Sequence, residues 1–150
     1  MTQGLPTGFD GPDDSPGLLL WRVTNRWQAA MRAALKPFGL THVQFVLLAS
    51  LSWMGADRPG EPVTQADLAA FAQTDPMMTS QVLRALESAG LVERRAHPTD
   101  RRARRLAVTP AGTDLAGRAV VAVEQADNEY FRVLGEVGPF TAALRALSGP

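Results

Sequence analysis

The chain has 150 residues, 45% of them hydrophobic, which is the size of one ordinary domain that buries a core without metal or disulfide staples. It contains no cysteine, which excludes disulfides, a thiolate zinc site and a catalytic or redox-sensing thiol. Only His42 and His97 offer imidazole ligands, and they stand 55 positions apart, so the sequence predicts neither a metal site nor a cofactor.

Residues 1–14 have neither the basic region nor the apolar stretch of a secretory signal, and no later run of about 18 apolar residues follows. We therefore expect a cytoplasmic protein with no membrane partner. The same residues are rich in Gly, Pro and Thr and offer few anchors for a core, which predicts a flexible N-terminal arm.

The formal net charge is zero, but the charges are unevenly distributed. Residues 84–105 contain seven arginines and three carboxylates, a net charge of +4, so the rest of the chain sums to −4. Segregation of positive charge into one short region is typical of a protein that meets DNA with one face. The preference for Arg carries less information, because Lys36 is the only lysine.

Two helices are predicted in the first third of the chain. Ser15 and Pro16 provide a cap and a first-turn proline, and apolar residues then recur at three- and four-residue spacing as far as residue 36. Thr41 and Gln44 form a capping-box pattern ahead of a nearly continuous apolar run, which predicts a central helix ending at Gly55.

The next two predicted helices are short and close together. Thr64 opens one that runs to about residue 72, and Asp75 with Pro76 opens another that runs to residue 89 before Gly90. Two helices joined by a turn of about three residues are typical of the helix-turn-helix arrangement.

After Gly90 the pattern changes to two short strands, residues 91–95 and 104–108, joined by a turn-rich loop. Thr109 and Pro110 then open a long amphipathic helix, which Gly138 and Pro139 are expected to break, and a last helix follows as far as Gly149. The predicted fold is mainly α: a winged helix-turn-helix with a two-stranded wing and helices at both ends.

The second helix of the predicted pair has a core face and a polar face. Its wheel assigns Met78, Val82, Leu86 and Ala89 to the core. The opposite face carries the candidate DNA readers, Ser80, Gln81 and Arg84. Gln pairs bidentately with adenine and Arg with guanine, while Ser serves either a base or a phosphate. A solvated helix face is the alternative, and it applies most to Met77 and Ser88, which share that side.

Three segments together resemble the MarR family of bacterial regulators: residues 86–94 (LESAGLVER), 98–103 (PTDRRA) and 108–112 (VTPAG). The resemblance extends over roughly residues 18–147. It implies that Asp100 orders the wing loop and that Arg102 lies at the minor groove, where narrow DNA concentrates negative potential. Arg101 is the next candidate for a DNA contact. The chain departs from the family at His97, where an acidic residue commonly precedes the proline.

The resemblance also implies a homodimer formed by residues 15–36 and 110–148, with a DNA-binding lobe at about residues 41–109 of a single 15–150 domain. Apolar stripes at both chain ends independently favour a dimer, although packing within one subunit remains an alternative. The first two helices carry a group of large side chains that could receive a small aromatic or amphipathic ligand, aromatic acids included, or simply pack in the core: Trp21, Trp27, Met31, Trp53 and Met54.

These patterns predict a sequence-specific DNA-binding transcription regulator, a ligand-responsive repressor that binds a pseudo-palindromic operator as a homodimer. The alternative is a winged-helix module for protein contacts, because a fold does not dictate its function. An enzyme is not expected, because the sequence has no Gly-rich phosphate loop and no nucleophile elbow.

Overall fold

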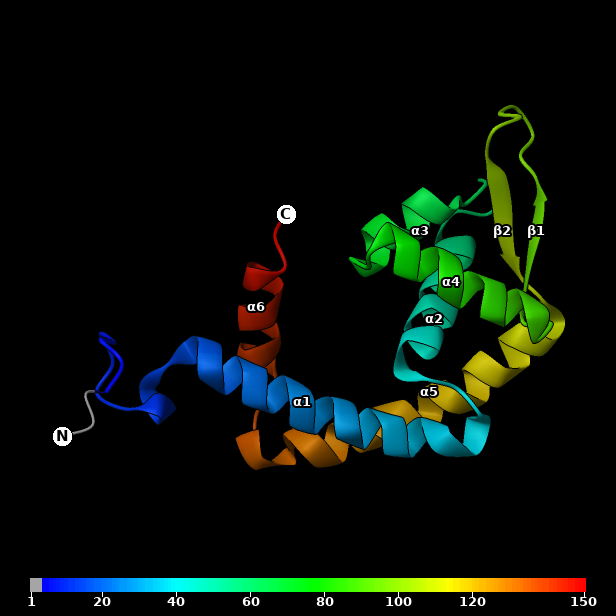
Figure 1. Cartoon of the computed structure of the whole chain (residues 1–150). Coiled ribbons are helices and arrows are strands. Elements are labelled where there is room, and N and C mark those ends of the chain that lie inside the picture. The colour runs from blue at the N-terminus through cyan, green and yellow to red at the C-terminus, as the bar shows by residue number, and fades with distance from the viewer. Residues whose placement is uncertain (1–3) are drawn as a thin grey trace.

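The computed structural model describes residues 4–150, which form six α-helices, three short 3-10 turns and one antiparallel strand pair (Figure 1). The longer elements are α1 (Pro16–Leu35), α2 (His42–Asp57), α3 (Gln65–Ala72), α4 (Pro76–Ser88), β1 (Val92–Ala96), β2 (Arg104–Val108), α5 (Pro110–Phe131) and α6 (Gly138–Leu147). Helices α1 and α5 run side by side, and α2, α3, α4 and the hairpin form a lobe on one side of them (Figure 1). The predicted mainly helical winged fold is confirmed.

The N-terminal segment contains one turn of 3-10 helix, η1 (Pro12–Asp14), ahead of α1. Asp13 accepts a hydrogen bond from the Arg22 guanidinium at 2.7 Å, which ties this turn to α1. Residues 1–3 of the predicted arm lie outside the described residues. Within residues 4–150 no single helix is long and apolar enough to cross a membrane; α1 and α2 satisfy that test only jointly and are bent by 76° between them.

Helix α2 begins as predicted but ends later. The Thr41 hydroxyl accepts from the Gln44 amide at 3.2 Å, and the Gln44 side chain accepts from the Thr41 amide at 3.0 Å. The helix then passes through Gly55 to Asp57, so the predicted stop at Gly55 is wrong. A glycine inside a helix costs only about 1 kcal/mol. The Arg58 amide still donates to the Met54 carbonyl, and Met54 stays buried, so the helix continues past that glycine.

Helices α3 and α4 form the predicted helix-turn-helix. Asp75 caps α4 by accepting from the Met78 amide at 2.9 Å. The predicted core face of α4 is partly wrong, because Met78 is 38% exposed and Ala89 is exposed as well. The buried residues of α4 are Thr79, Leu83 and Leu86.

Thr79 can be buried because its hydroxyl is satisfied: it donates to the Asp75 carbonyl at 2.8 Å and lies 2.6 Å from the Thr74 hydroxyl. The helical wheel read from the sequence does not assign Thr79 to the core. The capping geometry supplies the missing acceptor, and the core face is therefore rotated towards Thr79 and Leu83.

The wing pairs Val92 with Val108 at its base and Ala96 with Arg104 near its tip. Leu106 is buried, and its amide donates to the Val63 carbonyl at 2.8 Å, which attaches the hairpin to the segment before α3. The second strand lies where the sequence predicts it, and the first begins one residue later than predicted.

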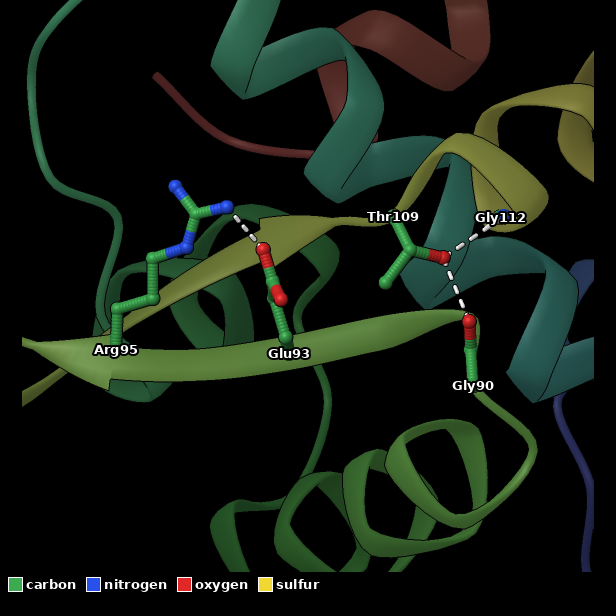
Figure 2. A network of polar contacts seen from close by, with 5 residues as sticks. All are labelled: Gly90, Glu93, Arg95, Thr109 and Gly112. Atoms are coloured by element: carbon green, nitrogen blue, oxygen red, sulfur yellow. Dashed lines mark hydrogen bonds and ion pairs between the residues drawn. The ribbon is translucent and has the colours of Figure 1, made fainter.

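A close junction joins α4, the wing and α5 (Figure 2). The Thr109 hydroxyl donates to the Gly90 carbonyl at 2.6 Å and accepts from the Gly112 amide at 3.1 Å. A Cβ on Gly112 would lie 2.1 Å from the Leu91 carbonyl oxygen, so only glycine fits there. The first turn of α5 is therefore held directly against the start of the wing.

The long helix near the C-terminus ends earlier than predicted. Helix α5 ends at Phe131, and the reversal lies at Gly135, whose φ of 73° suits glycine. Gly138 and Pro139 begin α6 instead of breaking a helix, because proline is favoured in the first turn. No residue of α6 is buried, and α6 projects away from α1 and α5 (Figure 1).

Candidate nucleic-acid interface

Helix α4 presents the predicted readers together on one side. Gln81 and Arg84 are exposed and Ser80 is half-buried. Ser80 and Arg84 are one turn apart, and the Arg84 guanidinium lies 3.4 Å from the Ser80 hydroxyl. This contact is long and exposed, so it leaves the guanidinium able to reach a base or a phosphate.

The wing tip is ordered by side chains that accept backbone hydrogen bonds. The Asp100 carboxylate accepts from the Arg102 amide at 2.9 Å. The Nδ1 atom of His97 accepts from the amides of Thr99 at 3.2 Å and Asp100 at 3.0 Å. His97 thus supplies the acceptor that a carboxylate would supply at the same place.

Two of the seven arginines between residues 84 and 105 are held by carboxylates. Arg94 pairs with Glu87 at 2.9 Å, and Arg95 pairs with Glu93 on the same strand (Figure 2). Within residues 4–150 the other five form no ion pair: Arg84, Arg101, Arg102, Arg104 and Arg105. These five unpaired arginines lie on α4, β2 and the wing tip.

The Glu87–Arg94 pair links the last turn of α4 to the first strand of the wing. One terminal nitrogen of Arg94, Nη2, is buried without a hydrogen-bond partner. The order of residues along the chain does not show that Glu87 lies beside Arg94, so the sequence alone does not predict this pair. The pair fixes the wing relative to α4.

A cavity of about 550 Å³ lies between α2 and α5. Of the five predicted ligand residues, Trp53 lines this cavity. Trp53 and Met54 also line a second cavity of about 290 Å³, next to Phe71. Met31 is fully buried in the core, while Trp21 is 68% exposed on α1. The structure therefore does not bring the five side chains to a single cavity.

Trp27 lies at the junction of α1, α2 and α5. Its indole N–H donates to the Asp127 carboxylate at 2.7 Å. Its ring packs edge-on against the His42 ring, with 5.1 Å between the ring centroids. A place near the start of a helix suggests an exposed side chain, but His42 is half-buried. Burial lowers the pKa of His42 below 6.5, although Asp127 partly offsets this effect.

Within residues 4–150 no group of three or more His, Asp or Glu side chains is arranged to hold a metal ion. A capped helix-turn-helix followed by a basic hairpin defines the class of winged-helix DNA-binding proteins.

Comparison with known proteins gives the family within that class. The profile of the MarR family matches residues 40–103. The HTH-type transcriptional regulator YdcH of Bacillus subtilis is 44% identical over 139 residues, which is 93% of each chain. The HTH-type transcriptional repressor Rv2887 of Mycobacterium tuberculosis is 40% identical over 116 residues, or 77% of this chain and 79% of that protein. The chain belongs to the MarR family of helix-turn-helix transcription regulators.

Solved structures agree with this assignment. CouR of Rhodococcus jostii RHA1, in complex with p-coumaroyl-CoA, is 29% identical with a TM-score of 0.79 and covers 95% of this chain and 97% of its own. The C80S variant of Escherichia coli MarR, in complex with operator DNA, has a TM-score of 0.77 at 22% identity, covers 87% and 91%, and supports the fold alone.

Proposed function

We propose that this regulator is a homodimeric repressor that binds a pseudo-palindromic DNA site through α4 and the wing. The observation that carries the proposal is the set of five arginines without ion pairs beside the exposed face of α4. Arginine supplies both phosphate affinity and guanine recognition. The name of the mycobacterial relative, a transcriptional repressor, supports the direction of regulation.

The two DNA-contacting elements have different roles in this proposal. Helix α4 enters the major groove, where Arg84 and Gln81 read base edges and Ser80 contacts a base or phosphate. Arg102 occupies the minor groove, and Arg101 contacts the backbone. Asp100 binds no DNA, but its carboxylate holds the Arg102 amide and so orders the loop.

A second copy of the chain would cover the apolar surface left at both chain ends. Exposed large apolar side chains on α1, on the α5–α6 connection and on α6 are Leu19, Leu20, Trp21, Val23, Val133, Leu134, Val137, Leu144 and Leu147. Exposed large apolar side chains in this number support an interaction site. A two-fold dimer through these helices places two α4 helices about one DNA turn apart, roughly 34 Å.

The cavity between α2 and α5 supports a ligand response. Helix α2 belongs to the DNA-binding lobe, whereas α5 continues from the wing junction towards the C-terminal helices (Figure 1). A ligand that fits this cavity in one arrangement of the two helices shifts the population towards that arrangement. CouR, the similar protein that binds p-coumaroyl-CoA, supports a ligand of aromatic character.

The experiment is selection of duplexes from a randomised library with the purified protein, followed by affinity measurements on the enriched sequence. We expect enrichment of two inverted half-sites and an affinity that falls as salt rises. A protein-interaction module would enrich no sequence. Failure to enrich any sequence at low salt would therefore refute the proposed function.

A further inference from the structure

We infer that the cavity between α2 and α5 accepts an aromatic or amphipathic ligand that carries a positive charge, and that it disfavours aromatic acids. This inference rests on the proposed ligand response and names the ligand class. It differs from the expectation from sequence, in which aromatic acids are among the candidates.

The walls of the cavity are mainly apolar. Helix α2 contributes Phe45, Ala49 and Trp53, and α5 contributes Ala116, Val120 and Val123. A volume of about 550 Å³ is in the range of pockets for small organic ligands. Trp53 is largely exposed, so its ring is available to stack against an aromatic group or a cation.

Among residues 4–150, the charged side chains that line the cavity are Glu124 and Asp127. They stand three positions apart on α5 and therefore lie on the same face of the helix. Neither forms an ion pair within residues 4–150, and no Arg, Lys or His lines the cavity. An anion that enters meets two negative charges without compensation, whereas a cation is attracted by both.

Asp127 is held in position by its neighbours. One carboxylate oxygen, Oδ1, accepts the Trp27 indole N–H at 2.7 Å, which leaves Oδ2 for a ligand. His42 packs against Trp27, and Asp127 acts electrostatically on its imidazole. Burial lowers the pKa of His42, so at neutral pH its ring is uncharged and does not neutralise Asp127.

The experiment compares three compounds that share one skeleton: 4-phenylbutylamine, 4-phenylbutan-1-ol and 4-phenylbutanoate. Binding to the full chain at neutral pH is followed by calorimetry up to millimolar concentration, and release of the selected duplex is measured in parallel. We expect the amine to bind most tightly and the acid least, with a difference of about tenfold or more.

Two sets of variants make the comparison specific. Glu124→Gln combined with Asp127→Asn removes both negative charges and should bring the affinities for amine and acid close together. The amide oxygen of the new Asn can still accept from the Trp27 indole, so this contact is kept. Asp114→Asn is the matched control, since Asp114 is an exposed carboxylate on the same helix that pairs with Arg118 and does not line the cavity. It should leave the preference unchanged, and circular dichroism checks that each variant is folded.

The outcomes separate this inference from the proposed function. Equal or tighter binding of the acid overturns the inference, while release of DNA by that acid would uphold the ligand response. Binding of none of the three compounds overturns the cavity as a ligand site altogether. Tight amine binding that leaves DNA affinity unchanged upholds the ligand class and refutes its coupling to DNA.

Discussion

Arg84 and Arg102 carry the same charge on different elements, so their loss should have different effects. Arg84→Ala removes a proposed base contact and should cost about 1–3 kcal/mol on the selected duplex, with relaxed preference at one base position. Arg102→Ala should weaken selected and scrambled duplexes alike and reduce the salt dependence. Fluorescence anisotropy at several salt concentrations measures both. If the two variants lose affinity in the same pattern, the division of roles between α4 and the wing is wrong.

Asp100 tests whether the wing must be ordered before it binds. Asp100→Ala removes a negative charge near the phosphates, but it also removes the acceptor of the Arg102 amide. We expect weaker DNA binding by anisotropy, because the lost loop order outweighs the relief of repulsion. Asp100→Asn retains an acceptor and should stay close to the wild type. Tighter binding by the alanine variant would show that charge repulsion dominates.

His42 should make stability depend on pH. Because burial lowers its pKa in the folded chain, the unfolded chain binds the proton first as pH falls. As far as His42 is concerned, the free energy of unfolding is therefore highest above about pH 6.5. It decreases as pH falls from there towards the lowered pKa.

His42→Phe keeps an aromatic ring beside Trp27 and should remove this pH dependence of stability. The measurement is urea unfolding between about pH 5 and 7, a range that includes the pKa of histidine in the unfolded chain. His97→Asn, at the other histidine, serves as the control and should retain it. An unchanged slope in the phenylalanine variant would exclude His42 as the source.

At the scale of elements, the junction at Gly112 holds α5 against the wing. Gly112→Ala places a methyl group against the Leu91 carbonyl and should destabilise the fold by about 1–3 kcal/mol in urea unfolding. Gly117→Ala, on the same helix, meets nothing within 4 Å and should stabilise by up to about 1 kcal/mol through helix propensity. Equal effects of the two substitutions would mean that the junction tolerates a side chain.

Helix starts were predictable from sequence because caps are local. A side chain accepts an amide within its own first turn at Ser15, Thr41, Thr64, Asp75 and Thr109. Helix ends were less predictable, since Gly55 and Gly138 are both glycines within helices and the reversal is made by Gly135. Whether a glycine ends a helix depends on packing beyond it, which the local sequence does not contain.

In the candidate site, too, contacts within one segment were easier to predict than contacts between distant segments. The family resemblance implied that Asp100 orders the wing loop, and the hydrogen bond that Asp100 accepts from the Arg102 amide lies within that one short loop. The Glu87–Arg94 pair and the cavity between α2 and α5 were not predictable, because they join segments that only the fold brings together. The five predicted ligand residues lie on α1 and α2, and the sequence does not show which sides of these two helices face each other.

At the scale of the whole molecule, the basic and the apolar surfaces lie on different elements. Five arginines without ion pairs lie on α4 and the hairpin, whereas the exposed large apolar residues near the chain ends lie on α1, the α5–α6 connection and α6. In the proposed dimer, this separation would leave two α4 helices free for DNA while another set of helices forms the interface. Helix α5 connects the two surfaces through the Thr109 junction (Figure 2).

The most direct test of this account measures the affinity and stoichiometry of the full chain on three duplexes: the selected site, a half-site and a scrambled site. We predict two chains per selected duplex, binding at least about a thousandfold tighter than to the scrambled site at physiological salt, and an affinity that falls steeply as salt rises. The half-site should bind far more weakly than the full site. Equal affinity for all three duplexes, or one chain per selected duplex, would contradict a dimeric, sequence-reading regulator.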